Sequence, residues 1–138
     1  MTLDRKASLD LALIGNCSIA ALVDRMARVV WLCLPRFDGD PVFHGLLGTC
    51  SDERDGLFAI ELENAVRSEQ AYQENTAVVV TRIFDDAGNA IEITDFAPRF
   101  QTKGRMFRPT ALVRRVRPLS GHPRIRVRCR PRFDYGAR

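Results

Sequence analysis

The sequence predicts an all-β fold, an antiparallel β-sandwich, on two observations. Runs of five to nine apolar or alternating residues recur along the 138-residue chain, and each run ends at Gly, Asp, Asn or Pro, as short strands joined by turns do. Helical periodicity is almost absent between these turns. About eight or nine short strands at this spacing favour a sandwich or barrel of antiparallel strands.

The first pair of strands is expected at residues 18–23 and 29–34, joined by a charged turn. Both segments are nearly continuous in apolar residues, which is typical of strands covered on both faces. Residues 41–47 are expected to form one short helical turn, because Asp40 is a suitable N-cap and Pro41 is favoured at the first helical position.

The middle of the chain contains the clearest strand signal. Residues 76–84 include three consecutive valines followed by threonine, a composition enriched in strands. A loop rich in Asp and Gly at residues 85–89 then predicts a hairpin, and in the returning strand, residues 90–96, isoleucines alternate with polar residues. Further strands are expected at residues 57–63, at 69–73 as a short polar edge strand, at 107–116 and at 124–133.

The last of these strands, residues 124–133, alternates strictly between five arginines and an apolar set. A strand so near the end of the chain is expected at a sheet edge, where unpaired backbone groups invite pairing with another chain. We therefore expect a sandwich that is incomplete at its C-terminal edge, covered by a continuation of the domain or by a second copy. In the second case the protein forms a homo-oligomer through its edge strands.

Length and composition describe one globular domain over residues 1–138. Hydrophobic residues make up 46% and charged residues 28%, values typical of a folded chain. No run approaches the roughly 18 apolar residues of a membrane span, and residues 1–6 contain no apolar signal core. We expect a cytoplasmic location and no membrane association.

The four cysteines are expected to be reduced thiols, and neither a metal nor another cofactor is predicted. Cys17, Cys33, Cys50 and Cys129 include no closely spaced pair. All but Cys50 lie in apolar or alternating segments, where free cysteine behaves as a small hydrophobic residue. A metal site would need ligands from distant segments, and the chain has only two histidines to contribute.

Charge is distributed unevenly along the chain. The formal net charge is +4, yet residues 1–98 carry −8 and residues 99–138 carry +12. An arginine-lined face over residues 124–133 makes nucleic-acid binding one hypothesis. The alternative, which we favour, is that these arginines pair with the acid-rich first part of the chain or dock on another domain. The aromatic platform of single-strand binders is not evident.

Three blocks of sequence in a fixed order cover most of the chain. Residues 14–48 contain WLCLPRFD, residues 75–98 contain ITDFAP, and residues 112–136 contain LVRRV and RPRFDYG. As an ordered set, these blocks resemble the N-terminal domain of the bacterial glucoamylase- and trehalase-like enzymes of glycoside hydrolase family 15. The first turn departs from the family pattern, because Met26-Ala27 replaces the usual Asp-Gly type of turn.

The resemblance implies a β-sandwich of the supersandwich type that precedes a catalytic (α/α)6 barrel. Members of that family hydrolyse α-linked glucosides with inversion, using two barrel glutamates, and an inverting pair stands about 6.5–9.5 Å apart. No stretch of the 138 residues matches the barrel, so no catalytic residue is assigned; Glu61 and Glu63 fit a solvated sheet face better. The implied partner is the catalytic barrel of the same enzyme, which acts on an α-linked glucoside.

Arg36, Phe37 and Asp38 are the candidate substrate-binding residues. They lie in a proline-led loop after the second predicted strand, and loops held by a rigid sandwich commonly carry binding groups. Arg36 and Asp38 offer hydrogen bonds to sugar hydroxyls, and Phe37 offers a ring that stacks on a pyranose. The competing interpretation is that Arg36 and Asp38 pair with each other while Phe37 fills the core.

The sequence therefore predicts a non-catalytic N-terminal domain that supports a catalytic barrel and places a loop near its substrate pocket. A stand-alone carbohydrate-binding domain that uses Trp31, Phe37 or the other aromatic residues is the first alternative. A basic nucleic-acid-binding β-domain is the second.

Overall fold

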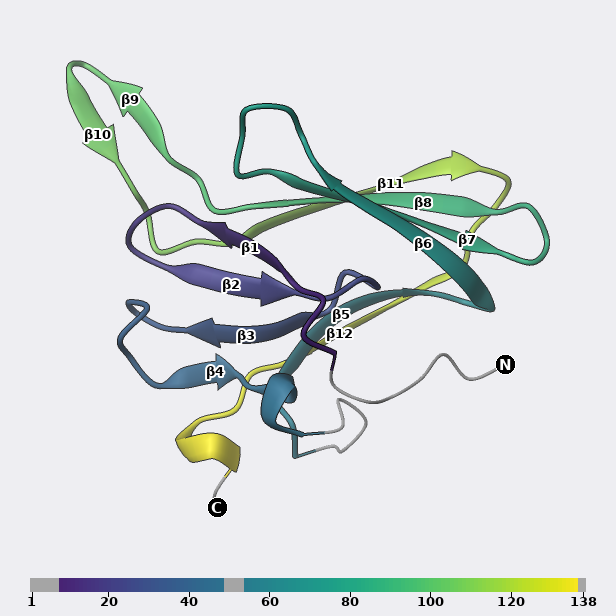
Figure 1. Ribbon diagram of the computed structural model, residues 1–138, viewed down its shortest axis with the longest axis horizontal. Helices are drawn as coiled ribbons and strands as arrows, with labels where there is room; N and C mark the ends of the chain where they lie inside the picture. Colours follow the sequence, from purple (N-terminus) through teal and green to yellow (C-terminus); the bar gives the residue numbers. More distant parts are fainter. Residues whose placement is uncertain (1–7, 49–53, 137–138) are drawn as a thin grey trace.

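The computed structural model describes residues 8–48 and 54–136 of the chain. Within them the chain forms two antiparallel β-sheets that share one core, together with a two-stranded hairpin that projects away from both (Figure 1). No α-helix occurs in the described part of the chain. The predicted all-β sandwich is confirmed.

The larger sheet has the strand order β1-β2-β3-β5-β12, and β4 pairs with β3 beside this path. Its strands are β1 (Ala12–Gly15), β2 (Ala20–Val23), β3 (Val29–Cys33), β4 (Pro41–Phe43), β5 (Leu57–Leu62) and β12 (Ile125–Arg130). The β12 strand crosses from the end of the chain to lie antiparallel to β5, with Val127 opposite Ile60.

The smaller sheet has the order β11-β8-β7-β6. Its strands are β6 (Ala65–Tyr72), β7 (Val79–Asp85), β8 (Ala90–Phe96) and β11 (Val113–Ser120). Between β8 and β11 the chain makes the projecting hairpin of β9 (Phe100–Thr102) and β10 (Arg105–Phe107). Two short 3-10 turns complete the chain, η1 (Gly45–Leu47) and η2 (Asp134–Gly136).

The core lies between the two sheets and is built from the alternating residues of their inner faces. On β8, Ile91 and Ile93 are 1% and 0% exposed, and they pack in the same cluster as Ile14 and Ile60 of the larger sheet. All of the buried apolar residues precede residue 98. The arginine-rich remainder of the described chain therefore adds strands to the sandwich without adding fully buried apolar side chains.

The turn between β2 and β3 explains how Met26-Ala27 replaces a glycine-containing turn. Ala27 has φ +58°, in the left-handed region that glycine adopts most easily. Asp24 stabilises this conformation, since its Oδ1 accepts hydrogen bonds from the backbone N–H groups of Met26 (3.0 Å) and Arg28 (2.9 Å). The carboxylate also pairs with Arg28 Nε at 2.6 Å. The aspartate thus holds the alanine where glycine is normally favoured.

Most of the predicted strands are found, and two predictions were wrong. Residues 41–47 are not a single helical turn, because β4 occupies Pro41–Phe43 and only Gly45–Leu47 are helical. The N-cap position belongs to His44 rather than Asp40. Pairing of β4 with the apolar strand β3 outweighs the local capping signal.

The second wrong prediction is a strand over residues 107–116. The structure has the β9–β10 hairpin, then a non-strand connection, then β11 from Val113 to Ser120. Pro118 does not end the strand, because β11 is an edge strand with a bulge between Pro118 and Ser120, where proline is tolerated. The short strand β1 was not predicted, and β6 is an edge strand as expected but longer.

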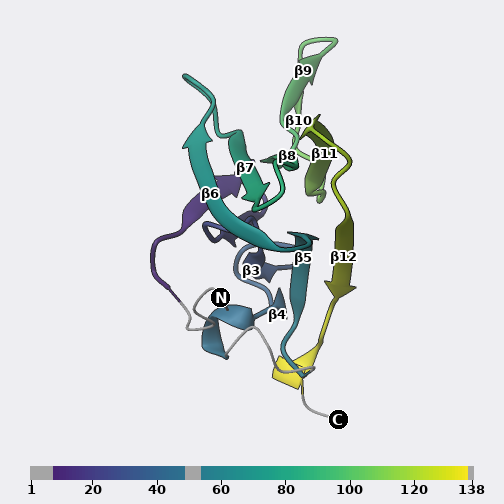
Figure 2. The ribbon, with the colours of Figure 1, turned by 90° about the vertical axis from the view of Figure 1, so that its right-hand side faces the viewer.

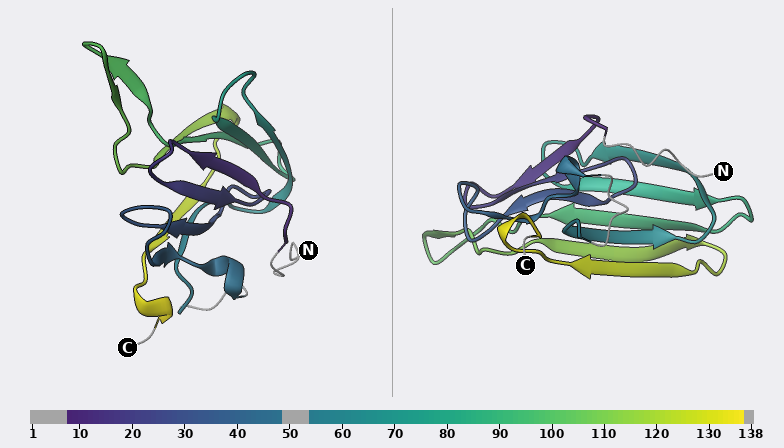
Figure 3. Two further views of the ribbon diagram at one scale, coloured as in Figure 1. Left: turned by 60° about the vertical axis from the view of Figure 1, so that its left-hand side comes forward. Right: turned by 90° about the horizontal axis from the view of Figure 1, so that it is seen from below.

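The expected C-terminal edge is confirmed. Within the described residues β12 pairs only with β5, and β11 pairs only with β8. The two strands follow one another along the same side of the molecule (Figures 2 and 3). Ile125 and Val127 on β12 are 42% and 56% exposed, although the residues opposite them, Leu62 and Ile60, are buried. The sandwich is therefore open along this edge.

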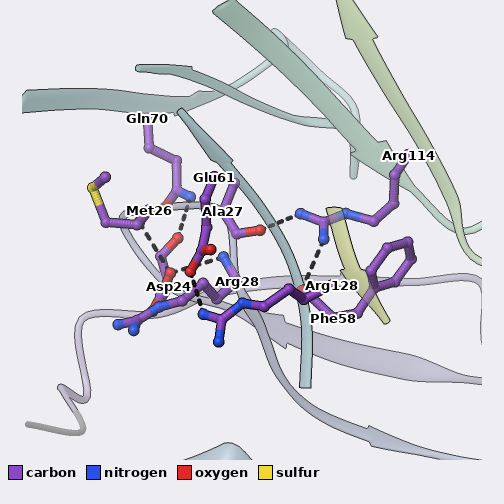
Figure 4. A network of polar contacts seen from close by, with 9 residues as sticks. All are labelled: Asp24, Met26, Ala27, Arg28, Phe58, Glu61, Gln70, Arg114 and Arg128. Carbon is purple, nitrogen blue, oxygen red and sulfur yellow. Dashed lines mark hydrogen bonds and ion pairs between the residues drawn. The ribbon is translucent and has the colours of Figure 1, made fainter. Parts of the chain in front are cut away.

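A buried arginine joins the two sheets. Arg114 of β11 donates to the backbone carbonyl oxygens of Phe58 (2.9 Å) and Ala27 in the larger sheet and its turn (Figure 4). The same guanidinium pairs with Asp95 of β8, with 2.7 Å between Nε and Oδ1. Burial raises the pKa of Asp95, and the hydrogen bonds from Arg114 oppose that effect.

Candidate functional site

The loop that carries Arg36, Phe37 and Asp38 connects β3 to β4 at one end of the sandwich. Two backbone hydrogen bonds close it, from Leu34 N to Asp40 O (3.3 Å) and from Gly39 N to Arg36 O (2.9 Å). Gly39 is required here, because a Cβ atom at this position would lie 2.7 Å from the Leu34 carbonyl oxygen. The loop is therefore a compact unit fixed by its own backbone.

The three candidate side chains all point into solvent. Arg36 and Asp38 form an ion pair with 2.8 Å between Nη2 and Oδ2, and their side chains are 72% and 58% exposed. Phe37 is 62% exposed. The competing interpretation expected Arg36 and Asp38 to pair with each other, and this pair is present. The same interpretation expected Phe37 to fill the core, and this expectation is wrong. The loop presents an aromatic ring beside a paired cation and carboxylate.

A second segment, the turn between β1 and β2, lies directly against this loop. Phe37 N donates to the Ser18 carbonyl oxygen at 3.3 Å. Next to Ser18, Cys17 is exposed and has φ +71°, and its Sγ accepts a hydrogen bond from Arg99 Nη1 at 3.4 Å. The turn thus bridges the Arg36–Asp38 loop and the chain segment that enters the β9–β10 hairpin.

Asn16 fixes the geometry of this end of the sandwich. Its side chain is buried, and its Nδ2 donates to the backbone oxygens of Pro98 (2.9 Å) and Pro109 (2.8 Å), one on each stem of the hairpin. Its Oδ1 accepts from Ser18 N (3.0 Å) and Ile19 N (3.1 Å). All of its hydrogen-bonding groups are therefore used to hold three segments together.

Sequence reasoning did not assign a role to Asn16. An asparagine in a turn between apolar runs signals a local side-chain hydrogen bond, and the bonds to Ser18 and Ile19 are of that kind. The bonds to the hairpin stems span 82 and 93 residues, a separation at which a single sequence carries no signal.

The β9–β10 hairpin forms the third part of this end (Figure 3). Phe100 and Phe107 face each other across the two strands, with ring centroids 5.5 Å apart and an interplanar angle of 12°. The two residues are 50% and 42% exposed. Here too the sequence was misleading, because Phe107 was expected to begin a longer strand.

The arginines of β11 and β12 do not form one free basic face. Arg128 pairs with Glu61 across the β5–β12 ladder, and Arg114 and Arg117 pair with Asp95 and Glu92. These contacts agree with the interpretation that the C-terminal arginines pair with acidic residues earlier in the chain. Because Glu61 is engaged by Arg128, it is not a free carboxylate.

Other features bear on chemistry. In the described ranges, no group of three or more His, Cys, Asp and Glu side chains is arranged to hold a metal ion. Cys17, Cys33 and Cys129 are free thiols, and burial raises the pKa of Cys33; Cys50 lies outside the described residues. A search of the described residues finds no helix with the length and apolar character needed to cross a membrane.

Comparison with known proteins identifies relatives over almost the whole chain. The family described as trehalase-like, N-terminal, matches residues 4–138. A trehalase of Thermoplasma volcanium is 32% identical over 125 residues, which are 89% of this chain and 19% of that protein. Trehalase 1 of Sulfolobus acidocaldarius is 33% identical over 130 residues, 91% of this chain and 20% of that protein. No solved structure matches the chain.

The chain thus spans about one fifth of the length of these curated relatives. The family match over residues 4–138 includes both sheets and the candidate loop.

Proposed function

The chain belongs to the family of trehalase-like N-terminal domains, and from this premise we propose that it is the non-catalytic N-terminal β-sandwich of an α-glucoside hydrolase of the glucoamylase or trehalase type. The family match over residues 4–138 carries the proposal. In such an enzyme the catalytic groups belong to a following (α/α)6 barrel, as the resemblance to glycoside hydrolase family 15 implies. The sandwich, residues 1–138, packs against that barrel and supports it.

Within this enzyme the Arg36–Asp38 loop borders the substrate pocket. Its three side chains are exposed and are held on a closed loop whose backbone is braced by the β1–β2 turn. An arginine and an aspartate supply both donors and acceptors for sugar hydroxyls, and Phe37 offers a ring for a pyranose face. The pair is preorganised, since each charge already orients the other at 2.8 Å.

Two measurements on one sample test this proposal. The first is the intact mass, in the source cell, of the polypeptide that begins Met1-Thr2-Leu3, which is expected to be far above 15.6 kDa. The second is glucose release from trehalose, maltose and soluble starch. We expect release by the whole polypeptide and none by the 138-residue chain. Release by the 138-residue chain itself would contradict a non-catalytic role.

A second candidate function is a stand-alone carbohydrate-binding domain. The observation that favours it is the exposure of Phe37, a residue that is 62% exposed between the paired residues Arg36 and Asp38. Isothermal titration of the 138-residue chain with malto-oligosaccharides separates the two functions. Saturable heat that Phe37→Ala abolishes supports independent binding, whereas a purely supporting domain gives none.

The proposal extends to the cellular location and the assembly of the protein. We propose a cytoplasmic enzyme, a location supported by the buried free thiol of Cys33, since reduced cysteines persist in that compartment. The 138-residue chain alone is expected to self-associate through β11 and β12, whose edges are open within the described structure. Light scattering that gives a monomer at all concentrations would contradict self-association.

A further inference from the structure

No other segment in the described part of the chain covers the β9–β10 hairpin. It projects from the sandwich (Figures 1 and 3), and residues 99–110 are all exposed. Among them are Phe100 (50%), Met106 (49%) and Phe107 (42%). Large apolar side chains gathered on a projecting element mark an interaction site more often than isolated ones do.

The hairpin is held in a defined position. Asn16 binds both of its stems through the carbonyl oxygens of Pro98 and Pro109, and Arg99 bonds to Cys17. Its register places Phe100 opposite Phe107 and Thr102 opposite Arg105, so these four side chains share one face. An arm with a fixed base loses less conformational freedom on docking than a mobile loop does.

The charge of the arm restricts what can cover it. Arg99, Lys103, Arg105 and Arg108 lie on it or on its stems, and no acidic residue occurs from residue 96 to residue 133. A second copy of the arm would bring like charges together, which disfavours self-pairing. The complementary surface is an apolar patch with an acidic rim.

We propose that the β9–β10 hairpin is a docking arm whose Phe100–Phe107 face is covered by an apolar, acid-rimmed surface on the catalytic part of the same polypeptide. This inference rests on the proposed function, which supplies that catalytic part. The aromatic pair provides the apolar anchor, and Lys103 and Arg105 at the tip pair with carboxylates around it. The arm therefore fixes the orientation of the sandwich on its neighbour.

Hydroxyl-radical labelling with mass spectrometric mapping tests the arm in the whole polypeptide. Labelling of Phe100 and Phe107 is expected to fall several-fold relative to the isolated 138-residue chain. Tyr72, on the edge strand β6 and 50% exposed, serves as the internal reference. The double variant Lys103→Glu/Arg105→Glu is expected to restore labelling, and Arg126→Glu, an exposed arginine on β12, is the matched control that leaves protection intact.

The outcomes distinguish failure of the docking arm alone from failure of the proposed function. Equal labelling in the whole polypeptide and the isolated chain overturns the docking arm, while glucose release by the whole polypeptide leaves the proposed function standing. Concentration-dependent protection of the isolated chain identifies a second copy as the occupant and overturns the arm. Protection of the isolated chain by maltoheptaose or trehalose identifies a sugar-binding surface and also overturns it. An intact mass of 15.6 kDa removes the proposed function and the arm together.

Discussion

Arg114 and Asp95 form an ion pair that is almost completely excluded from solvent, with side chains 2% and 0% exposed. The two residues face each other across β8 and β11. Nη1 and Nη2 of the same guanidinium donate to the carbonyl oxygens of Phe58 and Ala27, respectively, in the other half of the sandwich. One side chain therefore satisfies a buried carboxylate and couples the two sheets, and its guanidinium also lies 4.8 Å from the centroid of the Phe58 ring.

Replacing Arg114 by Met is expected to lower the free energy of unfolding by about 3–5 kcal/mol, the usual cost of leaving a buried charge without its partner. Urea unfolding followed by tryptophan fluorescence measures it. Arg115→Met is the matched control, because Arg115 is the next residue on β11 and is exposed; its effect is expected within about 0.5 kcal/mol. A similar small effect for Arg114→Met would show that the pair does not hold the sheets together.

Stability is expected to fall as the pH drops below the ordinary range of a glutamate carboxyl. Hydrogen bonds from Arg117 and then Arg82 lower the pKa of Glu92. The unfolded chain therefore binds the proton at a higher pH than the folded chain does. Between these two pKa values the free energy of unfolding increases with pH, so the stabilisation is complete above the unfolded pKa and is lost as the pH falls through the folded one.

Thermal unfolding from pH 6 down to pH 3 tests this dependence. Glu92→Gln is expected to flatten the acid limb of the profile, because the variant cannot take up the proton. An unchanged acid limb in the variant would assign the pH dependence to other carboxylates, such as Asp85, whose pKa is also lowered by its hydrogen bond from Asn89.

Asn16→Ala is expected to loosen the β9–β10 hairpin at its base. The substitution leaves the carbonyl oxygens of Pro98 and Pro109 without a donor and removes the acceptor for Ser18 and Ile19. Loss of buried hydrogen bonds of this kind costs about 1–3 kcal/mol. Hydrogen–deuterium exchange should accelerate in residues 97–112, while exchange in β7 remains slow. Unchanged exchange in the hairpin would show that Asn16 is not its anchor.

Arg36→Ala in the whole enzyme is expected to raise KM without lowering the stability of the sandwich. The Arg36–Asp38 pair is exposed on both sides, and such pairs contribute about 0–1 kcal/mol. Arg25→Ala is the matched control, since Arg25 forms a similarly exposed pair with Asp10 at the other end of β3. If steady-state kinetics gave the same KM for both variants and the unaltered enzyme, the proposal that the loop borders the substrate pocket would be contradicted.

The sequence alone was sufficient to predict those strands whose amino-acid composition or alternation is typical of a strand. The β-branched run of β7 and the alternation in β8 are local signals, and both strands are found as expected. The β4 segment was mistaken for part of a helical turn because its sequence contains a local capping signal. Its pairing with β3 involves a separate segment of the chain and leaves no such local signal. Strand pairing decides such short segments, and a single sequence does not contain it.

The candidate site was predictable only in part, for the same reason. The Arg36–Asp38 loop is visible as a proline-led polar interruption between apolar runs, and its ion pair joins residues two apart. The partners of Asn16 and the contacts of Arg114 lie far away in sequence. Nothing in the local pattern distinguishes Arg114 from Arg115, although one is buried between the sheets and the other is exposed.

The position of the core in the chain has a consequence for biosynthesis. Among the residues that the structure describes, every fully buried apolar side chain precedes residue 98, and chains emerge from the ribosome N-terminus first. The nascent chain can therefore collapse around these residues while the arginine-rich segment is still being translated, and Leu112 and Val116 pack against that core afterwards. Asp95 has no cationic partner until Arg114 is synthesised, so the addition of β11 to the sandwich completes a buried ion pair on a core that is already largely apolar.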